Sequence, residues 1–237
     1  MIRSPLIWVL WGMWPYASLR CYELILKESI KYSNWRKNSD FPHIIIDNIP
    51  VKELTSSEES LKETVFYVKN EYERLKNNWA NIFIMACNTM HLYYNEIFED
   101  ENNIINLSLI NETVNKIKQD FFETVGILWT INTVKSWLYT TALEKKWILW
   151  VNIEDESILG DINNIIKKII WWVTILNDDE INTLTSSVAI LQEKWAKSII
   201  LGCTELPIAF KHIDVDIKLY DPMIIAIRKA LEYYYNK

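Results

Sequence analysis

Short apolar runs alternate with amphipathic stretches along this 237-residue sequence, and this alternation constrains the fold more than any other feature. Such an alternation is typical of βα units, which build mostly parallel sheets. The predicted strands are Leu6–Leu10, His43–Ile46, Ile82–Ala86, Ile104–Leu107, Val125–Leu128, Ile148–Ile153, Trp172–Ile175 and Ser198–Leu201. We therefore expect an α/β protein in which helices flank parallel sheets.

Two of the intervening stretches show the period of a helix with one apolar face. In the first, apolar residues recur at steps of four and three, and Ser56 and Glu59 form a capping box at its start. Its apolar residues are Leu61, Val65, Val68, Tyr72 and Leu75. The second stretch repeats these steps with Leu184, Val188, Leu191 and Trp195. We assign both stripes to the core.

The sequence also contains a weak internal repeat of strand and loop. The loop with Gly12 is followed 75 residues later by Cys87, and the loop with Trp129 is followed 74 residues later by Cys203. Both cysteines come directly after an apolar run. Two similar α/β halves, each ending one strand in a cysteine loop, would explain this spacing.

Charge and cysteine content exclude several classes of function. The net charge of -6, without long runs of one sign, argues against nucleic-acid binding and a polybasic membrane patch. Three cysteines without a CxxC pair do not form a disulfide framework and favour a cytoplasmic protein. Gly12 and Pro15 interrupt the N-terminal apolar stretch, which is too short to span a bilayer, so we disfavour a signal peptide.

The two cysteine loops carry the chemistry that we expect. Cys87 precedes Asn88 and Thr89, and Cys203 precedes Thr204. Ligands of open α/β sheets bind at the carboxyl ends of the strands, where these loops are predicted to lie. Backbone N–H groups at a helix start favour an anion and lower a thiol pKa from about 8.5 toward neutrality. One such site could hold a carboxylate and ionise a thiol.

Two such loops suggest proton transfer by a pair of cysteines. One thiolate would remove the Cα proton of an amino acid and the other thiol would protonate the opposite face, without a cofactor or metal. Buried structural cysteines are the alternative, and we assign that role to Cys21. Cys87 and His91 have the spacing of a metal-ligand pair, but no further ligands lie nearby in the sequence.

The motifs CNTMH at Cys87–His91 and LGCTELP at Leu201–Pro207 resemble the aspartate/glutamate racemase superfamily, specifically its aspartate racemase branch. WGMWP at Trp11–Pro15 and VGILWTINTVKSWLYTTAL at Val125–Leu143 are similar to further family segments. The resemblance implies two Rossmann-like domains related by a pseudo-twofold axis, with the active site between them. It also implies a homodimer. We place residues 1–108 and 212–237 in the first domain and 109–211 in the second.

The resemblance also assigns roles to single residues. It makes Cys87 and Cys203 the acid/base pair of an isomerase. It gives the binding of the amino-acid substrate to Met13, Asn88, Thr89, Thr130, Thr204 and Glu205. His91, like Glu205, is expected behind the site or facing the substrate ammonium group, with a structural role as the alternative.

Two departures from the family pattern leave the preferred amino acid open. Aspartate-specific members commonly carry an arginine after the second strand, where this chain has Pro50–Thr55 and only Lys52 as a loose substitute. A lysine that some members supply has only Lys167 or Lys168 as a counterpart. Aspartate, glutamate and a broader range therefore remain candidates. The alternatives are a cysteine-dependent isomerase or decarboxylase of the same superfamily, and a catalytically silent amino-acid-binding protein.

The tryptophan content is abnormal. The chain has 4 glycines and 12 tryptophans, whereas glycine usage of about 7% predicts about 17 glycines. Positions where the family pattern has glycine carry Trp8, Trp11, Trp14, Trp79, Trp129, Trp137, Trp147 and Trp195, and further tryptophans in loops or near helix ends are Trp35, Trp171 and Trp172. We hypothesise that UGA codons meaning glycine are represented here as tryptophan. We expect these indoles at the mouth of the active site or on loop surfaces. Burial of Trp11, Trp14 and Trp129 in a core away from the site would contradict this.

Overall fold

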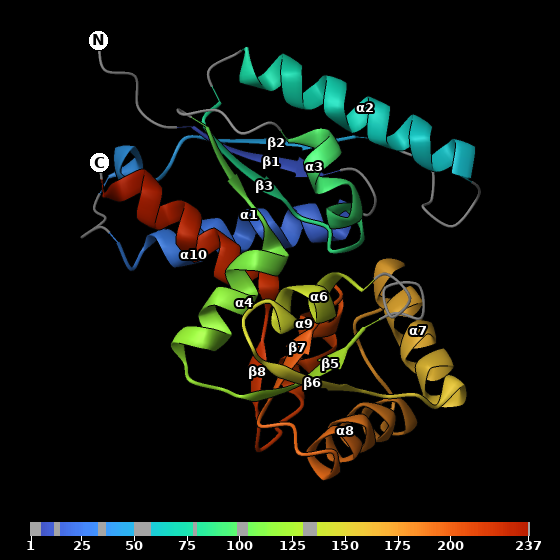
Figure 1. Ribbon diagram of the computed structural model, residues 1–237. Helices are drawn as coiled ribbons and strands as arrows, with labels where there is room; N and C mark the ends of the chain where they lie inside the picture. Colours follow the sequence, from blue (N-terminus) through green and yellow to red (C-terminus); the bar gives the residue numbers. More distant parts are fainter. Residues whose placement is uncertain are drawn as a thin grey trace. The chain divides into compact units, whose positions relative to one another are not determined.

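The computed structural model describes residues 6–11, 15–32, 37–49, 58–77, 80–98, 104–129 and 137–236. The chain divides into two compact units, one of Met1–Leu109 with Ala226–Lys237 and one of Ile110–Ile225. Each unit contains a four-stranded parallel sheet flanked by helices (Figure 1). The predicted α/β fold with two similar halves is confirmed.

Unit 1 is built on the strand order β2-β1-β3-β4. Its strands are β1 (Ile7–Trp11), β2 (Ile44–Asn48), β3 (Ile82–Met85) and β4 (Ile105–Leu107). Its helices are α1 (Pro15–Ser29), α2 (Glu58–Lys76), α3 (Tyr94–Ile97) and most of α10 (Pro222–Tyr235), with the 3-10 turns η1 (Asn38–Asp40) and η2 (Thr89–Tyr93). The central strand β1 is apolar and buried, as parallel strands covered on both faces require.

Unit 2 repeats this topology with the strand order β6-β5-β7-β8. Its strands are β5 (Thr124–Leu128), β6 (Leu149–Asn152), β7 (Ser198–Leu201) and β8 (Lys218–Tyr220). Its helices are α4 (Leu109–Gln119), α6 (Leu138–Glu144), α7 (Glu156–Ile170), α8 (Asp178–Glu193) and α9 (Leu206–Ala209), followed by the 3-10 turn η3 (Phe210–His212). The first strand of each unit is therefore central, and the third strand lies beside it, which confirms the repeat predicted from the cysteine spacing.

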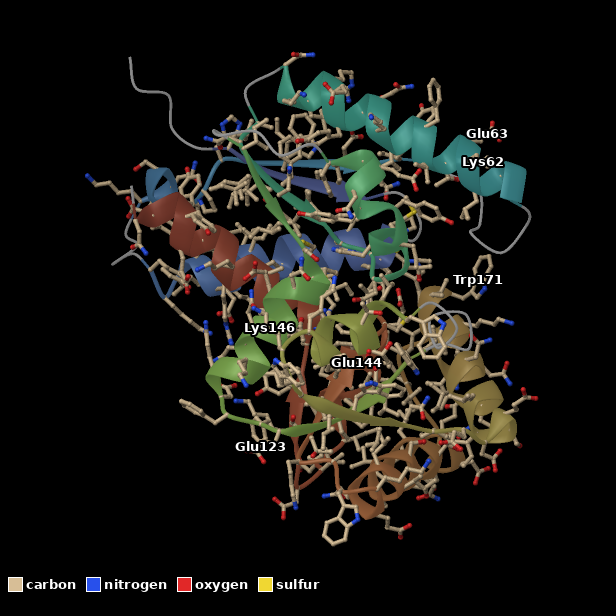
Figure 2. The ribbon with its side chains drawn as sticks, viewed as in Figure 1. Lys62, Glu63, Glu123, Glu144, Lys146 and Trp171 are labelled. Atoms are coloured by element: carbon tan, nitrogen blue, oxygen red, sulfur yellow. The ribbon has the colours of Figure 1, made fainter. Side chains whose placement is uncertain are left out.

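Helix α2 packs on the core of unit 1 with the apolar face that its sequence period predicts. The predicted stripe faces the core: Tyr72 and Leu75 are fully buried, and Val65 and Val68 are nearly so. Burying one such side chain contributes about 1.5–3 kcal/mol. Lys62 and Glu63 are exposed on the same helix (Figure 2). The predicted start of this helix at Ser56 lies outside the described residues.

The second predicted stripe is only partly correct. Leu184, Val188 and Leu191 are buried on α8, but Trp195 is 75% exposed. The helix ends at Glu193, and Trp195 turns the chain with a φ of 71°. Its side chain therefore leaves the face that the period predicts.

Two strand predictions need correction. The predicted strand Trp172–Ile175 is wrong: α7 ends at Ile170, Trp172 has a φ of 66°, and the segment is solvent-exposed. Exposed residues without a neighbouring strand have no ladder to join. Conversely, β8 was not predicted, because its three residues, Lys218–Tyr220, change from exposed to buried without an apolar run.

The chain returns to unit 1 later than we expected. Residues 212–225, which the prediction placed in the first domain, belong to unit 2, where β8 pairs with β7. Lys218 and Tyr220 both donate to Asp120 at the end of α4, at 2.6 and 2.7 Å. Helix α10 then lies beside α1 (Figure 1), where Arg228 pairs with Glu28 at 2.7 Å. No helix in the described segments combines the length and apolar character needed to cross a membrane.

Candidate active site

Cys87 and Cys203 occupy equivalent places in the two units, after the third strand. Ala86, before Cys87, donates its N–H to the carbonyl of Leu10 at 3.3 Å, and Gly202, before Cys203, donates to Leu128 at 2.7 Å. Both cysteines are half-buried, whereas Cys21 is fully buried in α1. The structure thus places a half-buried cysteine at the carboxyl edge of each sheet, where ligands of such sheets bind.

Gly202 allows the close approach of backbone beside Cys203. A Cβ at this position would lie 3.1 Å from the carbonyl oxygen of Leu128 and 3.1 Å from the Cβ of Trp129. Both contacts are tighter than ordinary van der Waals contact, and the first is to rigid backbone. A side chain at position 202 would therefore displace the cysteine loop or the end of β5.

The loop of unit 2 places a carboxylate against a thiol. The Cys203 Sγ–H donates to Oε2 of Glu205 at 2.8 Å, and the Thr204 hydroxyl donates to the same oxygen at 2.9 Å. Glu205 is only 2% exposed. Its carboxylate is therefore directed at its own loop, where it can accept the thiol proton.

Tyr139 also belongs to the surroundings of Cys203, although the sequence reasoning did not single it out. It is fully buried on α6, and burial raises its pKa well above the ordinary value. A hydrogen bond with Thr113 opposes this rise, while the charges of Asp221 and Cys203 add to it. Tyr139 lies inside a quoted family segment, but a tyrosine on a helix carries no motif that indicates such a neighbour.

The loop of unit 1 is held by His91. The His91 Nδ1 lies 2.7 Å from the Cys87 carbonyl oxygen, and the Leu109 N–H donates to Nε2 at 2.9 Å. Burial lowers the pKa of His91 to about 4, against the opposing effect of the hydrogen bond to Cys87. The ring is therefore neutral near pH 7, with the proton on Nδ1. Both ring nitrogens bind within unit 1, and the described residues contain no group of three potential metal ligands.

The helices that follow the cysteines are short. Cys87 leads into the five-residue turn η2 and the four-residue α3, and Cys203 leads into the four-residue α9. Few aligned peptides give a small helix dipole. An anion bound at these loops would therefore depend mainly on side-chain donors near the cysteines, among them the buried Asn88 and the half-buried Thr89.

Further polar groups share the edge of the first sheet. Asn48 ends β2 and pairs with Trp11 at the end of β1. The Ser18 hydroxyl, from the first turns of α1, donates to Oδ1 of Asn48 at 3.3 Å. Sequence reasoning missed both residues, although a polar residue that ends a predicted apolar run was a usable signal.

Several predicted site residues lie outside the described part of the chain, namely Met13, Lys52 and Thr130. Lys168 pairs with Glu180 at 2.8 Å and joins α7 to α8. Lys167 is exposed in the last turn of α7. The described contacts therefore give Lys168 a structural ion pair.

Most tryptophans in the described part of the chain are either exposed or buried; Trp150 is half-buried, and Trp35 and Trp79 lie outside the described residues. The exposed set consists of Trp137, Trp147, Trp171, Trp172 and Trp195, and Figure 2 labels Trp171 at the end of α7. These surface positions agree with expectation. Trp129, however, lies in the hydrophobic cluster of unit 2, contrary to the expectation of a place at the mouth of the site, and Trp8 is buried in unit 1. Trp14 and the side chain of Trp11 lie outside the described part.

Comparison with known proteins gives a consistent set of matches. The family described as Asp/Glu/Hydantoin racemase matches residues 10–230. The broad specificity amino-acid racemase RacX of Bacillus subtilis (strain 168) is 21% identical over 97% of this chain and 98% of its own length. An aspartate racemase homologue from Pyrococcus horikoshii OT3 superposes with a TM-score of 0.80 at 23% identity, covering 98% of this chain and 99% of that one. Picrophilus torridus aspartate racemase gives a TM-score of 0.71 at 19% identity, covering 99% and 100%.

Proposed function

Because the chain belongs to the Asp/Glu/Hydantoin racemase family, we propose that it is an amino-acid racemase that uses Cys87 and Cys203 as its acid/base pair and needs no cofactor. One observation carries the proposal: two sheets of identical strand order each place a half-buried cysteine after the third strand. A single structural thiol would not require this repetition.

Racemisation removes the Cα proton from one face of the amino acid and returns a proton to the other face. In the proposed reaction, one cysteine begins as the thiolate and takes the Cα proton, which leaves a carbanion. The other cysteine begins as the thiol and gives its proton to the opposite face, so both sulfurs must reach the same Cα. The two thiols exchange protonation states in each turnover and titrate as a coupled pair.

Hydrogen-bond donors must stabilise the negative charge that develops on the substrate. We assign this role to Asn88 and Thr89, which follow Cys87, and to Thr204, whose hydroxyl must turn from Oε2 of Glu205 to donate to the substrate. Donors aimed at a developing charge in a water-poor site lower the barrier more than they would in water. Met13 and Thr130 complete the proposed binding site.

Glu205 would supply the thiolate of Cys203. Transfer of the Sγ proton to Oε2, over the 2.8 Å hydrogen bond, converts a thiol and a carboxylate into a thiolate and a carboxylic acid. The reverse transfer restores the thiol. The balance between the two forms decides how often Cys203 can act as the base.

We propose an amino acid with an acidic side chain as the substrate, with a broader range as the alternative. The racemases of Picrophilus torridus and Bacillus subtilis are named for aspartate and for broad specificity, respectively. The arginine that aspartate-specific members commonly carry after the second strand has no match at Pro50–Thr55, and this favours the broader range of substrates. We also propose that the protein is cytoplasmic and forms a homodimer.

Solvent deuterium exchange at Cα tests the mechanism. The purified protein, incubated in D2O with L- or D-aspartate and glutamate, should incorporate deuterium at Cα and form the opposite enantiomer. Cys87→Ala and Cys203→Ala should each abolish racemisation, while Cys21→Ala, a change to the buried cysteine of α1, serves as the matched control and should retain it. Racemisation that survives in either active-site variant would refute the two-base mechanism. Substrate binding without any exchange would instead support the silent binding protein.

A further inference from the structure

Four tryptophans have a backbone conformation that is usually reserved for glycine. Their φ values are 56° at Trp137, 59° at Trp147, 66° at Trp172 and 71° at Trp195. In the described part of the chain, Phe121 is the only other non-glycine residue with positive φ, and no glycine there has it. A side chain with a Cβ is sterically penalised in this region, whereas glycine is not.

Three of these tryptophans also end a helix with the hydrogen bonds of the Schellman motif. After α6, Trp147 donates its N–H to Glu144 at 3.0 Å, and Ile148 donates to Leu143 at 3.1 Å. The same pair of bonds follows α7 at Trp172 and Val173, and α8 at Trp195 and Ala196. The left-handed residue of this motif is usually glycine.

The indoles at these positions gain little packing in return for the strain. Trp147 is 91% exposed and Trp195 is 75% exposed. The indoles of Trp8 and Trp129 are buried instead, and their Nε1–H groups meet no acceptor among the described residues. A buried indole N–H usually finds a partner.

We infer that Trp137, Trp147, Trp172 and Trp195 stand where the protein made in its own cell carries glycine. We extend the inference to Trp129 on a different ground: it is buried, against the expectation above, but its Nε1–H has no acceptor among the described residues. The cause would be a UGA codon that this cell decodes as glycine and that is written here as tryptophan. The 4 glycines and 12 tryptophans together approach an ordinary glycine content. The backbone geometry supports the assignment independently of composition.

Trp129 connects this inference to the proposed active site and in that respect rests on the proposed function. It follows β5, its Cβ lies 3.1 Å from the position of a Cβ on Gly202, and its ring packs on Tyr139 at 6.5 Å. Glycine at position 129 would free the volume of an indole beside the Cys203 loop. A small amino acid could then use that volume.

The codons of the gene decide the question. We expect UGA at positions 129, 137, 147, 172 and 195 and an ordinary phenylalanine codon at Phe121, and peptide mass spectrometry of the protein from its own cells should show glycine at the five UGA positions. UGG at any of the four left-handed positions would overturn the inference there.

Stability measurements provide a second readout that does not depend on activity. Trp147→Gly and Trp195→Gly should each raise the folding equilibrium constant about fivefold. Trp150→Gly is the control and should lower it, because Trp150 lies in β6 and its indole donates to Glu144 at 3.0 Å. Equal effects at all three positions would refute the backbone argument.

The glycine assignment and the proposed function can fail separately. If the codons are UGA but a folded Trp129→Gly variant shows no exchange at Cα, the proposed function is refuted and the glycine assignment stands.

A separate observation concerns His91, whose two ring nitrogens join the Cys87 carbonyl to the Leu109 N–H. The ring is 6% exposed and stacks on Tyr94 at 5.6 Å, and the Tyr94 hydroxyl donates to the Asn106 carbonyl at 2.6 Å. His91 thus connects the cysteine loop to the start of α4, and the stacked Tyr94 connects to β4. Only a neutral imidazole with the proton on Nδ1 makes both bonds.

We also propose that His91 is a positioning residue for Cys87, which it would serve by fixing the carbonyl of the cysteine and hence the direction of its side chain. The proposal rests on the catalytic role of Cys87, but the thiol itself can be measured without turnover. Asparagine at position 91 can still offer an N–H near Nδ1, whereas phenylalanine fills the space and offers none.

Iodoacetamide labelling of Cys87, in a background where Cys21 and Cys203 are alanine, tests this role. His91→Phe should change the labelling rate at least fivefold and shift the pH midpoint of labelling. In the full enzyme it should lower kcat with little change in KM. His91→Asn should restore part of both. Tyr94→Phe, which keeps the stacked ring, is the control. An unchanged labelling profile in a folded His91→Phe variant would overturn the proposal, even if racemisation fails for another reason.

Discussion

The return of α10 to unit 1 depends on a charged contact that can be tested quantitatively. Glu28 on α1 has a side chain that is 7% exposed and accepts from Lys31 at 2.7 Å and from Arg228 on α10 at 2.7 Å. Burial opposes its charge, but the hydrogen bonds from Arg228 and Lys31 outweigh this and hold the pKa of Glu28 below its ordinary value. Glu28→Gln keeps the shape of the side chain and removes its charge.

The expected loss follows from the exposure of the partners. Breaking a fully buried ion pair costs about 3–5 kcal/mol, because the remaining charge has no water. Here the side chains of Lys31 and Arg228 are 58% and 45% exposed and can be hydrated again. We therefore expect a loss of about 1–2 kcal/mol in the free energy of unfolding, or roughly 2–8 °C in Tm.

Urea unfolding followed by far-UV circular dichroism measures this difference. The control is Glu23→Gln on the same helix, which breaks the exposed pair with Lys27 and should cost at most about 0.5 kcal/mol. Because the folded-state pKa of Glu28 is lowered, its contribution is fully present above the unfolded value of about 4.5 and is lost as the pH falls through the folded value. A difference between wild type and Glu28→Gln that grows with acidification, or a loss above about 4 kcal/mol at pH 7, would refute this reasoning.

Three further predictions concern the site and unit 2. Glu205→Gln should lower kcat at least tenfold and slow iodoacetamide labelling of Cys203, because an amide cannot accept the thiol proton; unchanged labelling would argue against a base role. Asp120→Asn should cost about 1–2 kcal/mol in the free energy of unfolding at pH 7. Lys116, Lys218 and Tyr220 hold the pKa of this half-buried carboxyl well below its ordinary value, so the cost should shrink only in strong acid. Gly126→Ala should lower the free energy of unfolding by about 1–3 kcal/mol, because the added Cβ would lie 3.0 Å from the side chain of Leu191. The control is Gly160→Ala on α7, where the added Cβ meets open space and should stabilise the protein by about 0.5–1 kcal/mol. Equal effects in urea unfolding would refute the packing argument.

Sequence predicts the fold best where burial dictates residue type. The strands β1, β3, β5 and β7 are fully buried or nearly so, so they appear as continuous apolar runs and were found within one or two residues. At the sheet edge, β8 is recognisable only from its pairing with β7, which is a tertiary contact. Val173 and Ile175 show the converse, since apolar residues that follow a helix end can remain exposed.

The candidate site was predictable to a different extent. The cysteines were found because a polar motif follows an apolar run twice at nearly the same spacing. The direction of the Glu205 side chain and the two partners of His91 depend on loop conformations that have no periodic signal. Tyr139 reaches the surroundings of Cys203 from α6, more than 60 positions earlier, which no local pattern reports.

The two thiols have different surroundings, and this difference constrains the kinetics that the proposed enzyme can show. Cys203 donates to a buried carboxylate, whereas Cys87 lies in a loop whose carbonyl is held by a neutral imidazole. The resting enzyme should therefore favour one arrangement of protons, and the two enantiomers should show different values of kcat and of KM. Free L- and D-amino acids have equal energy in water, so kcat/KM must still be equal for the two directions. Unequal surroundings can consequently change kcat and KM only together, and a variant such as Glu205→Gln should alter both in each direction while leaving the ratio of the two kcat/KM values unchanged.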